Sequence, residues 1–351
     1  MRFEDLFIAA TGVWLPPAVP ADGVTPGSPR SDGITSVTVS RSESAPEMAT
    51  RAARSALARA GHRGDDIRLL LHANVYYQGH DLWPPASFIQ RYAEVGDCPA
   101  IEIRQMSNGG MAALGLAACH LVAAGDGAAA LITAADRFCP PGFDRWRSDA
   151  GTVYADGGAA IVLSRGTGFA RLRCLVTESD PGLERMHRGD DPFGAAPFSV
   201  RGRVDLDAAK RAFLAKAGIS ESVARVAARQ HMTIKRALAE AESNLTDIDW
   251  FVLPNFGRRR LELTYIGPYG IDIERTTWPW GRRVGHLGAG DQLAGLDHLA
   301  ATGRLRPGDR CLLAGVGAGF TWSCAVVEVL AVPGYPARGD DMARKEGPDD
   351  R

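Results

Sequence analysis

The stretch Ile101-Glu-Ile-Arg-Gln-Met-Ser107-Asn-Gly-Gly110 decides how the middle of the chain folds. It continues a strand expected over residues 100–105, and an almost uncharged helix is expected over 109–124. Ser107 therefore lies in a turn at the start of a buried helix, where unpaired N–H groups and the positive helix end favour a developing oxyanion. The two glycines leave room for a substrate beside the backbone. The local sequence alone favours a simpler interpretation, in which Ser107 is only the helix N-cap.

Strand and helix signals alternate on both sides of this turn. Ser44-Ala-Pro-Glu47 forms a capping box with proline in the first turn, which predicts a helix that ends at Gly61. Apolar runs predict strands, and periodic apolar positions predict further helices. The expected strands cover residues 6–13, 67–75, 100–105, 128–134, 158–163, 249–253, 310–315 and 321–330, and the expected helices cover 44–61, 87–95, 109–124, much of 206–244, and a stretch that starts near 288.

The second half of the chain repeats the pattern of the first. Residues 61–75 resemble 245–256, since each has a helix exit, an acidic turn and an apolar strand, and residues 125–135 resemble 308–319. Such pairing indicates an α/β protein built from two duplicated halves. We expect an N-terminal half over residues 1–165, a C-terminal half over 166–332, and a disordered tail over 333–351 that is rich in proline, glycine and charge.

Composition limits the function classes. The 351 residues are 45% apolar and 23% charged with a net charge of −1, which is typical of a globular protein and offers no broad surface for nucleic acid. No stretch has the roughly 18 apolar residues of a membrane span, and the N-terminus lacks the features of a signal peptide. The six cysteines are scattered without metal-ligand spacing, so we expect buried free thiols, no metal site and a cytoplasmic protein.

Four further motifs, with the Ser107 stretch, carry a family resemblance. They are Tyr154-Ala-Asp-Gly-Gly-Ala-Ala-Ile-Val-Leu163, Ile248-Asp-Trp-Phe-Val-Leu-Pro-Asn255, Gly285-His-Leu-Gly-Ala-Gly-Asp291 and Gly315-Val-Gly-Ala-Gly-Phe-Thr-Trp322. Over nearly all of residues 1–331 the chain resembles ketoacyl-acyl carrier protein synthase III of the thiolase superfamily. The resemblance implies a thiolase fold, with two βαβαβαββ-type halves in a five-layer αβαβα sandwich. It also implies a homodimer without a permanently bound cofactor, whose substrates are coenzyme A or acyl carrier protein thioesters that enter on their phosphopantetheine arm.

The family's catalytic motifs are only partly present. Its nucleophilic cysteine falls on Ser107, a replacement that resembles the daunorubicin-type priming branch. Its glycine-rich turn falls on Ala318 and Gly319, which implies a backbone oxyanion donor there beside the Ser107 N–H. Its His-Gln-Ala-Asn motif falls on Pro254-Asn-Phe-Gly257, which has no histidine, and the asparagine of its Gly-Asn-Thr-Ser motif becomes His286. Because that histidine–asparagine pair supports decarboxylative condensation, its loss favours simple acyl transfer.

His286 is the natural base for Ser107, because serine is a weak nucleophile without one. Asp291 lies five residues later and can orient the imidazole, which would complete a Ser107, His286 and Asp291 triad. In the simpler alternative, Asp291 is a first-turn acid that stabilises a helix and His286 is a plain loop residue. His187, in an irregular insertion, is a second candidate for binding or activating the substrate, although a lone loop histidine is more often solvated.

The resemblance also suggests substrate contacts. Arg145 and Trp146 are candidates for the mouth of the pantetheine tunnel, and they can equally cap a surface loop. Trp83 fits the position that reaches the partner's pocket in the dimer, and it can equally be a core or interface aromatic. The predicted substrate-binding residues are Asn108, Trp83, Asn255, Arg145 and Trp146.

Three functions remain open on the sequence. The leading prediction is an acyltransferase of polyketide or related natural-product biosynthesis, which forms an acyl-Ser107 intermediate and passes the acyl group to a second carrier protein, a hydroxyl or an amine. The second is a priming ketosynthase that condenses a starter acyl-CoA with a malonyl-carrier protein. The third is a non-catalytic partner that sets the starter choice of a synthase.

Overall fold

The computed structural model describes residues 1–21 and 32–335. Its strands are β1 (Phe7–Trp14), β2 (Ala18–Pro20), β3 (Ser36–Thr38), β4 (Ile67–Ala73), β5 (Ala100–Ile103), β6 (Ala129–Asp136), β7 (Gly157–Ser164), β8 (Ala170–Ser179), β9 (Trp250–Val252), β10 (Arg310–Gly317) and β11 (Thr321–Val329). Its α-helices are α1 (Ala45–Ala60), α2 (Pro85–Tyr92), α3 (Gly109–Ala124), α4 (Arg185–Arg188), α5 (Leu206–Ala217), α6 (Ile219–Glu240), α7 (Arg258–Leu261), α8 (Gly267–Tyr269), α9 (Trp278–Gly281) and α10 (Asp291–Ala301).

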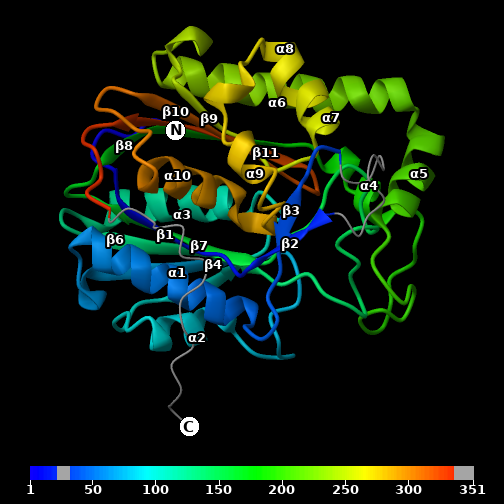
Figure 1. Ribbon diagram of the computed structural model, residues 1–351, viewed down its shortest axis with the longest axis horizontal. Coiled ribbons are helices and arrows are strands. Elements are labelled where there is room, and N and C mark those ends of the chain that lie inside the picture. The colour runs from blue at the N-terminus through cyan, green and yellow to red at the C-terminus, as the bar shows by residue number, and fades with distance from the viewer. Residues whose placement is uncertain (22–31, 336–351) are drawn as a thin grey trace.

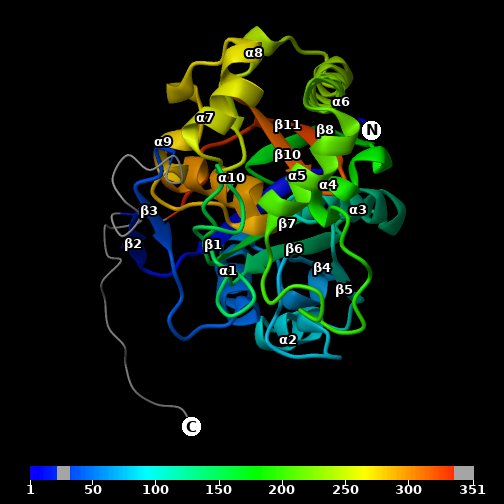
Figure 2. The same cartoon turned by 90° about the vertical axis from the view of Figure 1, so that its right-hand side faces the viewer.

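These elements stack in five layers, which run from top to bottom in Figure 1. Helix α6 covers strands β8 to β11, helices α3 and α10 fill the centre, and helices α1 and α2 lie below the strands of the first half. Helices α4 and α5 lie at one end of the sandwich and face the viewer in Figure 2. The five-layer αβαβα architecture predicted from the sequence is confirmed.

One continuous sheet supplies both strand layers. Among the described residues its order is β5-β4-β6-β7-β1-β8-β11-β10-β9. Strands from before residue 165 and strands from after it form two sets, and β1 and β8 join the sets through the pairs Phe7–Arg171 and Ile8–Ala170. Because the sheet doubles back there, the two sets face one another across α3 and α10. The division into two domains remains a prediction.

The outer helix of the first half begins as its capping box predicts. The Ser44 N–H donates to the Glu47 carboxylate at 2.6 Å, and the helix ends at Gly61 with a φ of 68°. Helix α1 packs closely on β1, since a Cβ added at Gly12 would lie 2.3 Å from the carbonyl oxygen of Ala52. Glycine at this position therefore sets the spacing between the first two layers.

The central helix α3 is apolar on almost every side. The stretch Met106–Ala124 is long and apolar enough to cross a membrane by length and composition, so the expectation that no stretch meets this test is wrong. More than half of that stretch is buried within the fold, between the two strand layers. A core helix meets the same test, because it too has no polar face.

The helices and strands predicted from the sequence are present, with ends shifted by a few residues. The sequence did not predict β8, the β2–β3 hairpin, or the short helices between residues 258 and 281. Tyr335 of the predicted tail is packed, since its hydroxyl accepts from the Thr11 N–H at 2.7 Å and its ring contacts the Arg59 guanidinium. Residues 336–351 of that tail lie outside the described residues. All six cysteines are free, but only Cys174, Cys311 and Cys324 are buried as expected; Cys98 and Cys139 are partly exposed and Cys119 is exposed.

Candidate active site

The turn that carries Ser107 joins β5 to α3. The N-cap of α3 is Asn108, so Ser107 precedes the cap and the N-cap interpretation of Ser107 does not hold. Met106 has a φ of 49°, which is uncommon for a residue with a side chain and turns the chain sharply before Ser107. Such strained residues are found disproportionately at functional sites. Ser107 is partly exposed, whereas Asn108 is fully buried.

The two glycines after the turn bring two distant segments together. A Cβ added at Gly110 would lie 2.4 Å from the carbonyl oxygen of Ala289, and one at Gly109 would lie 3.1 Å from the Ala289 side chain. The space that these glycines leave is filled by the segment before α10, not by open solvent or substrate. Their effect is to let this segment, which carries His286, approach the Ser107 turn.

Ser107, His286 and Asp291 lie in hydrogen-bonded series. The Ser107 Oγ is 2.8 Å from the His286 Nε2, and the His286 Nδ1 is 2.5 Å from the Asp291 Oδ2. An ionised carboxylate only accepts hydrogen bonds, so Nδ1 carries the proton. Nε2 then accepts from the Ser107 hydroxyl, which is the arrangement a serine nucleophile needs. His286 and Asp291 are almost completely buried.

The Asp291 carboxylate is held by backbone groups as well as by the imidazole. Its Oδ2 accepts from the Asn255 N–H and its Oδ1 from the Leu287 N–H, each at 2.8 Å. The Asn255 side-chain amide donates to the Gly285 carbonyl at 2.9 Å. Asn255, predicted to contact substrate, is therefore placed behind Asp291 and orients it. Asp291 is also the first residue of α10, so the helix-stabilising interpretation and the triad geometry are compatible.

Aromatic rings enclose the His286 imidazole. The Tyr154 ring meets it edge to face at 5.1 Å between centroids, and the Phe256 ring lies at 5.8 Å. The main chain of His286 is bonded on both sides, to Val153 O through its N–H and to the Ala155 N–H through its carbonyl. These contacts fix the ring plane. Sequence reasoning missed Tyr154 and Phe256, although both lie within motifs that it used.

A buried charged cluster, formed by Asp149, Lys210 and Arg260, adjoins this enclosure. The Tyr154 hydroxyl donates to the Asp149 carboxylate at 3.3 Å, and both Lys210 and Arg260 pair with the same carboxylate. Burial raises the pKa of Asp149, but the two cations outweigh burial and hold it well below its usual range. The cluster ties the loop before β7 to α5 and α7.

Asp136, at the end of β6, is a second buried carboxyl near His286. It accepts from the Val75 and Tyr76 N–H groups at 2.8 Å. Burial raises its pKa to about 7, against the opposing effect of those hydrogen bonds. An acidic residue that ends an apolar strand is the signal that could have identified it.

The glycine-rich turn between β10 and β11 packs directly on the Ser107 turn. A Cβ added at Gly317 would lie 2.3 Å from the Gln105 carbonyl oxygen and 2.8 Å from the Asn108 nitrogen. Next along the chain, Ala318 is partly exposed and Gly319 has open space where a side chain would stand. This arrangement leaves room for a substrate carbonyl beside the turn.

His187 lies on α4 and contacts Phe320, which follows Gly319 in this turn. Its ring meets the Phe320 ring edge to face at 5.4 Å between centroids. Burial and then the charge of Lys210 lower its pKa to about 4, so the imidazole is neutral. Its Nδ1 is buried and makes no hydrogen bond within the described part of the chain. Within the part of the chain that the structure describes, no hydrogen bond or ring contact joins His187 to Ser107 or His286.

The other residues that the sequence predicted to bind substrate make contacts within the protein instead. Arg145 is nearly buried and pairs with Asp156 at 3.1 Å, so the structure places it inside the fold and not at a tunnel mouth. The Asn108 amide donates to Gln105 and to Ser323, which holds the turn. Trp146 packs on the central core. Trp83 lies in a partly exposed loop, against His80 and Phe88.

The remaining histidines have the structural or exposed places expected of them. His72 is fully buried between Thr133 and Gln78, at 2.9 and 3.1 Å. His120 is exposed on α3. Within residues 1–21 and 32–335, no group of three or more His, Cys, Asp or Glu side chains is placed to hold a metal ion.

Comparisons with known proteins identify the family and the fold. The family model for the 3-oxoacyl-[acyl-carrier-protein] synthase III C terminal matches residues 238–329. The β-ketoacyl-[acyl-carrier-protein] synthase III of Rhizorhabdus wittichii is 26% identical over 289 residues, which cover 81% of this chain and 84% of that protein. The solved structure of the acyltransferase ChlB3 is 37% identical with a TM-score of 0.90, and the match covers 95% of this chain and all of that one.

A more distant solved structure agrees in fold. The synthase III FabH of Pseudomonas aeruginosa PAO1 has a TM-score of 0.73 at 20% identity, over 94% of this chain and 99% of that one. The protein is thus a member of the thiolase-fold class, in which acyl groups are transferred or condensed. Within that class, the chain belongs to the ketoacyl-acyl carrier protein synthase III family.

Proposed function

We propose that the protein is an acyltransferase of polyketide or related natural-product biosynthesis. It takes an acyl group from a carrier-protein or coenzyme A thioester onto Ser107 and passes it to a second carrier protein, a hydroxyl or an amine. The observation that carries this proposal is the hydrogen-bonded series of Ser107, His286 and Asp291. The 37% identity to an acyltransferase supports it.

The series suits a two-step transfer. The Ser107 Oγ attacks the thioester carbonyl while His286 takes its proton on Nε2, and Asp291 stabilises the resulting imidazolium. The C–S bond then breaks, and the leaving thiolate takes that proton. In the second step His286 removes a proton from the acceptor, which attacks the acyl-Ser107 carbonyl. The bond from the carbonyl carbon to the Ser107 Oγ then breaks, and His286 returns the proton to Oγ. We assign the oxyanion to the N–H of Ser107 and to the turn at Ala318 and Gly319.

Two features of the site favour transfer over condensation. Pro254 offers no imidazole at the position where the family resemblance places a histidine, and the Asn255 amide is already bonded to the Gly285 carbonyl. His286 has a single free ring nitrogen, which the Ser107 hydroxyl occupies. The side chains of Pro254, Asn255 and His286 therefore offer no free neutral donor for the enolate of a decarboxylated malonyl group.

A mostly apolar groove of about 830 Å³ between α6 and α7 offers a path for the thioester arm. Its lining includes Gly151, Met186, Leu214, Arg259 and Arg260. Arg260 lies over the Phe256 ring at 5.2 Å, and Phe256 in turn contacts the imidazole. We propose that the pantetheine arm lies in this groove, with Arg259 at its rim in the role that the sequence suggested for Arg145.

The homodimer and the cytoplasmic location stay proposals. Strand β5 lies at the edge of the sheet and exposes Ile101, and the neighbouring loop exposes Leu82 fully. An open strand edge flanked by apolar side chains is suited to pairing with a second chain. Sedimentation of the protein at micromolar concentration tests this, and a monomer would contradict it.

Intact mass of the wild type and of Ser107→Ala, each incubated with acyl-CoA thioesters of several lengths, tests the main proposal. We expect an acyl adduct on the wild type and none on the variant. Adding a malonyl-carrier protein should then release no carbon dioxide, whereas release would favour the priming ketosynthase. If the wild type forms no adduct with any donor, both enzyme functions are contradicted, and the function as a non-catalytic partner of a synthase remains.

A further inference from the structure

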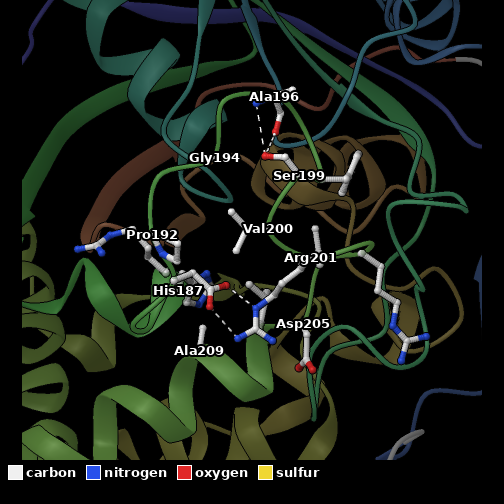
Figure 3. Close-up of a pocket in the computed structure, with 15 residues that line it drawn as sticks. His187, Pro192, Gly194, Ala196, Ser199, Val200, Arg201, Asp205 and Ala209 are labelled. Carbon is white, nitrogen blue, oxygen red and sulfur yellow. Dashed lines mark hydrogen bonds and ion pairs between the residues drawn. The ribbon is translucent and has the colours of Figure 1, made fainter.

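Six aspartate side chains are buried among residues 1–21 and 32–335, and five of them pair with a basic side chain. The pairs are Asp149 with Lys210, Asp156 with Arg145, Asp180 with Arg225, Asp291 with His286 and Asp297 with Arg59. Pairing also holds at the surface, where the dashed lines of Figure 3 join Arg201 to Asp191 beside a pocket of about 360 Å³. Asp136 is the sixth buried aspartate, and within the described part of the chain no basic side chain pairs with it.

The Asp136 carboxyl joins the chain after β4 to the segment after His286. Its Oδ1 accepts from the Val75 and Tyr76 N–H groups at 2.8 Å. Its Oδ2 accepts from the Ala289 N–H at 3.4 Å and faces Gly288, where an added Cβ would lie 2.2 Å from it. Gly288 also has a φ of 60°, so glycine serves both the turn and the approach of the carboxyl.

Both of these segments reach the reacting groups. The Tyr76 ring contacts two phenylalanine rings, which in turn contact Tyr154 beside the His286 imidazole. Ala289 packs on the first turn of α3, since a Cβ added at either glycine of that turn would meet it. The carboxyl therefore fixes the surroundings of the imidazole on one side and its distance from Ser107 on the other.

Asp136 also interacts with the charge of the base. Burial raises its pKa to about 7, and a proton on His286 opposes that rise. The interaction is reciprocal, so an ionised Asp136 stabilises the imidazolium that forms when Ser107 gives up its proton.

Other ionisable groups on the elements around Asp136 are neutral or already paired. Burial lowers the pKa of His72 to about 4 and raises that of Tyr76, so both side chains are uncharged near pH 7. The remaining groups have partners of their own, namely Arg145 for Asp156, His286 for Asp291 and the Arg41 carbonyl for Arg137. The imidazole is the neighbour whose charge changes during the proposed transfer.

We propose that Asp136 is a positioning residue of this site. It holds the segment from His286 to Asp291 against the Ser107 turn, and its ionised form strengthens His286 as the base. The inference rests on the proposed transfer through acyl-Ser107, to which it adds a second carboxylate from a separate strand.

Asp136→Asn tests the charge while it keeps the shape. An amide, like a protonated carboxyl, accepts at one end and donates at the other, so the variant imitates the protonated form at every pH. Below about pH 6, where Asp136 is protonated, the wild type should acylate no faster than the variant. Above about pH 8, where Asp136 is ionised, the wild type should be at least about threefold faster. The assay is single-turnover acylation by acetyl-CoA and butyryl-CoA, followed by intact mass.

Asp297→Asn is the matched control, because Asp297 is equally buried but bonds to Thr11 and Arg59, away from the site. The ratio of its rate to that of the wild type should not change with pH. An Asp136→Asn ratio that is the same at every pH, or a variant as fast as the wild type above about pH 8, would overturn the inference. Ser107-dependent adducts would in that case leave the proposed function standing. If neither thioester forms an adduct, the proposed function fails for these donors and the inference falls with it.

A second measurement does not depend on acylation. The ring resonance of His286, assigned by its loss in His286→Gln, should titrate at a lower pH in Asp136→Asn than in the wild type, because the imidazolium has lost a nearby negative charge. An unmoved titration would overturn the inference. If Asp136→Asn does not fold, the wild type alone decides, since two interacting groups give two titration steps in this resonance and an isolated imidazole gives one.

Discussion

Replacing Asp291 with asparagine tests the Ser107, His286 and Asp291 series at its most buried end. Three N–H groups converge on this carboxylate, from His286 and Asn255 on one oxygen and from Leu287 on the other. An amide has one oxygen and one NH₂ group. If the NH₂ faces His286, Nδ1 must accept, Nε2 keeps the proton, and the Ser107 hydroxyl loses its base. If the NH₂ faces Leu287, two donors meet and the imidazolium loses its negative partner.

Either orientation removes most of the general-base contribution. That contribution is typically about 10²–10⁴ in rate, which corresponds to about 2.7–5.5 kcal/mol of activation free energy. An N–H left unpaired in the buried site also costs about 1–3 kcal/mol of folding stability. We therefore expect Asp291→Asn to fold, to melt at a lower temperature, and to acylate at least about a hundredfold more slowly.

The assay is single-turnover acylation by an acyl-CoA, followed by intact mass at pH 7.5. Asp297→Asn is the matched control, because Asp297 is equally buried on the same helix but bonds to Thr11 and Arg59, away from the site. It should lose stability without losing the acylation rate. Acylation of Asp291→Asn within about threefold of the wild type would refute the triad and leave Asp291 as a helix-stabilising acid.

Three further outcomes follow from the packing and the pKa values. Gly317→Ala should slow acylation more than tenfold and lower the melting temperature, because overpacking against the Ser107 turn costs about 1–3 kcal/mol of stability. Gly166→Ala is its control and should do neither, because the new Cβ meets only the Ser164 hydroxyl at 3.7 Å. Burial lowers the pKa of His72 to about 4, below its unfolded value of about 6.5, so stability should fall as the pH drops from 6.5 to 4, by up to about 3 kcal/mol. Urea unfolding of His72→Gln should show a shallower loss, and an unchanged slope would contradict this. Arg145→Ala should lower the free energy of unfolding by about 3–5 kcal/mol, because it leaves buried Asp156 without its cation, and the KM for the thioester should not change. A raised KM at wild-type stability would instead support a place for Arg145 at the tunnel mouth.

The fold could be predicted wherever local pattern and burial agree. Helix α3 was placed correctly at both ends, since a run without charge between two glycines admits little else. Strand β8 was missed because Arg171 and Arg173 interrupt its apolar residues. Its strand conformation comes from pairing with β1 and β11, which are distant in sequence. That information is absent from any local window.

The candidate site residues could be predicted where the chemistry fixes the residue type. They could not be predicted where the role of a side chain depends on which other side chain it meets in the fold. Ser107, His286 and Asp291 were found from motif position and spacing, and the structure brings them together. Arg145 was assigned to a tunnel mouth because an arginine in a loop looks free in sequence. Its actual partner is Asp156, eleven residues later, and only the folded chain shows that the two side chains meet inside the protein.

The changes at Ser107, His286 and Asp291 are best understood as one change. A thiol loses its proton near pH 8.5 and can attack a thioester with little help, so a cysteine enzyme needs no hydrogen-bonded base in its resting state. A serine hydroxyl does need one. His286 meets that need by replacing an amide that can donate but cannot take a proton. Asp291 then stabilises the positive charge that the imidazole gains during the reaction. An asparagine at position 286 would gain no charge and would not need this carboxylate. The residue that makes the serine usable thus also removes a donor for condensation, so our proposal of acyl transfer rests on the whole set and not on Ser107 alone.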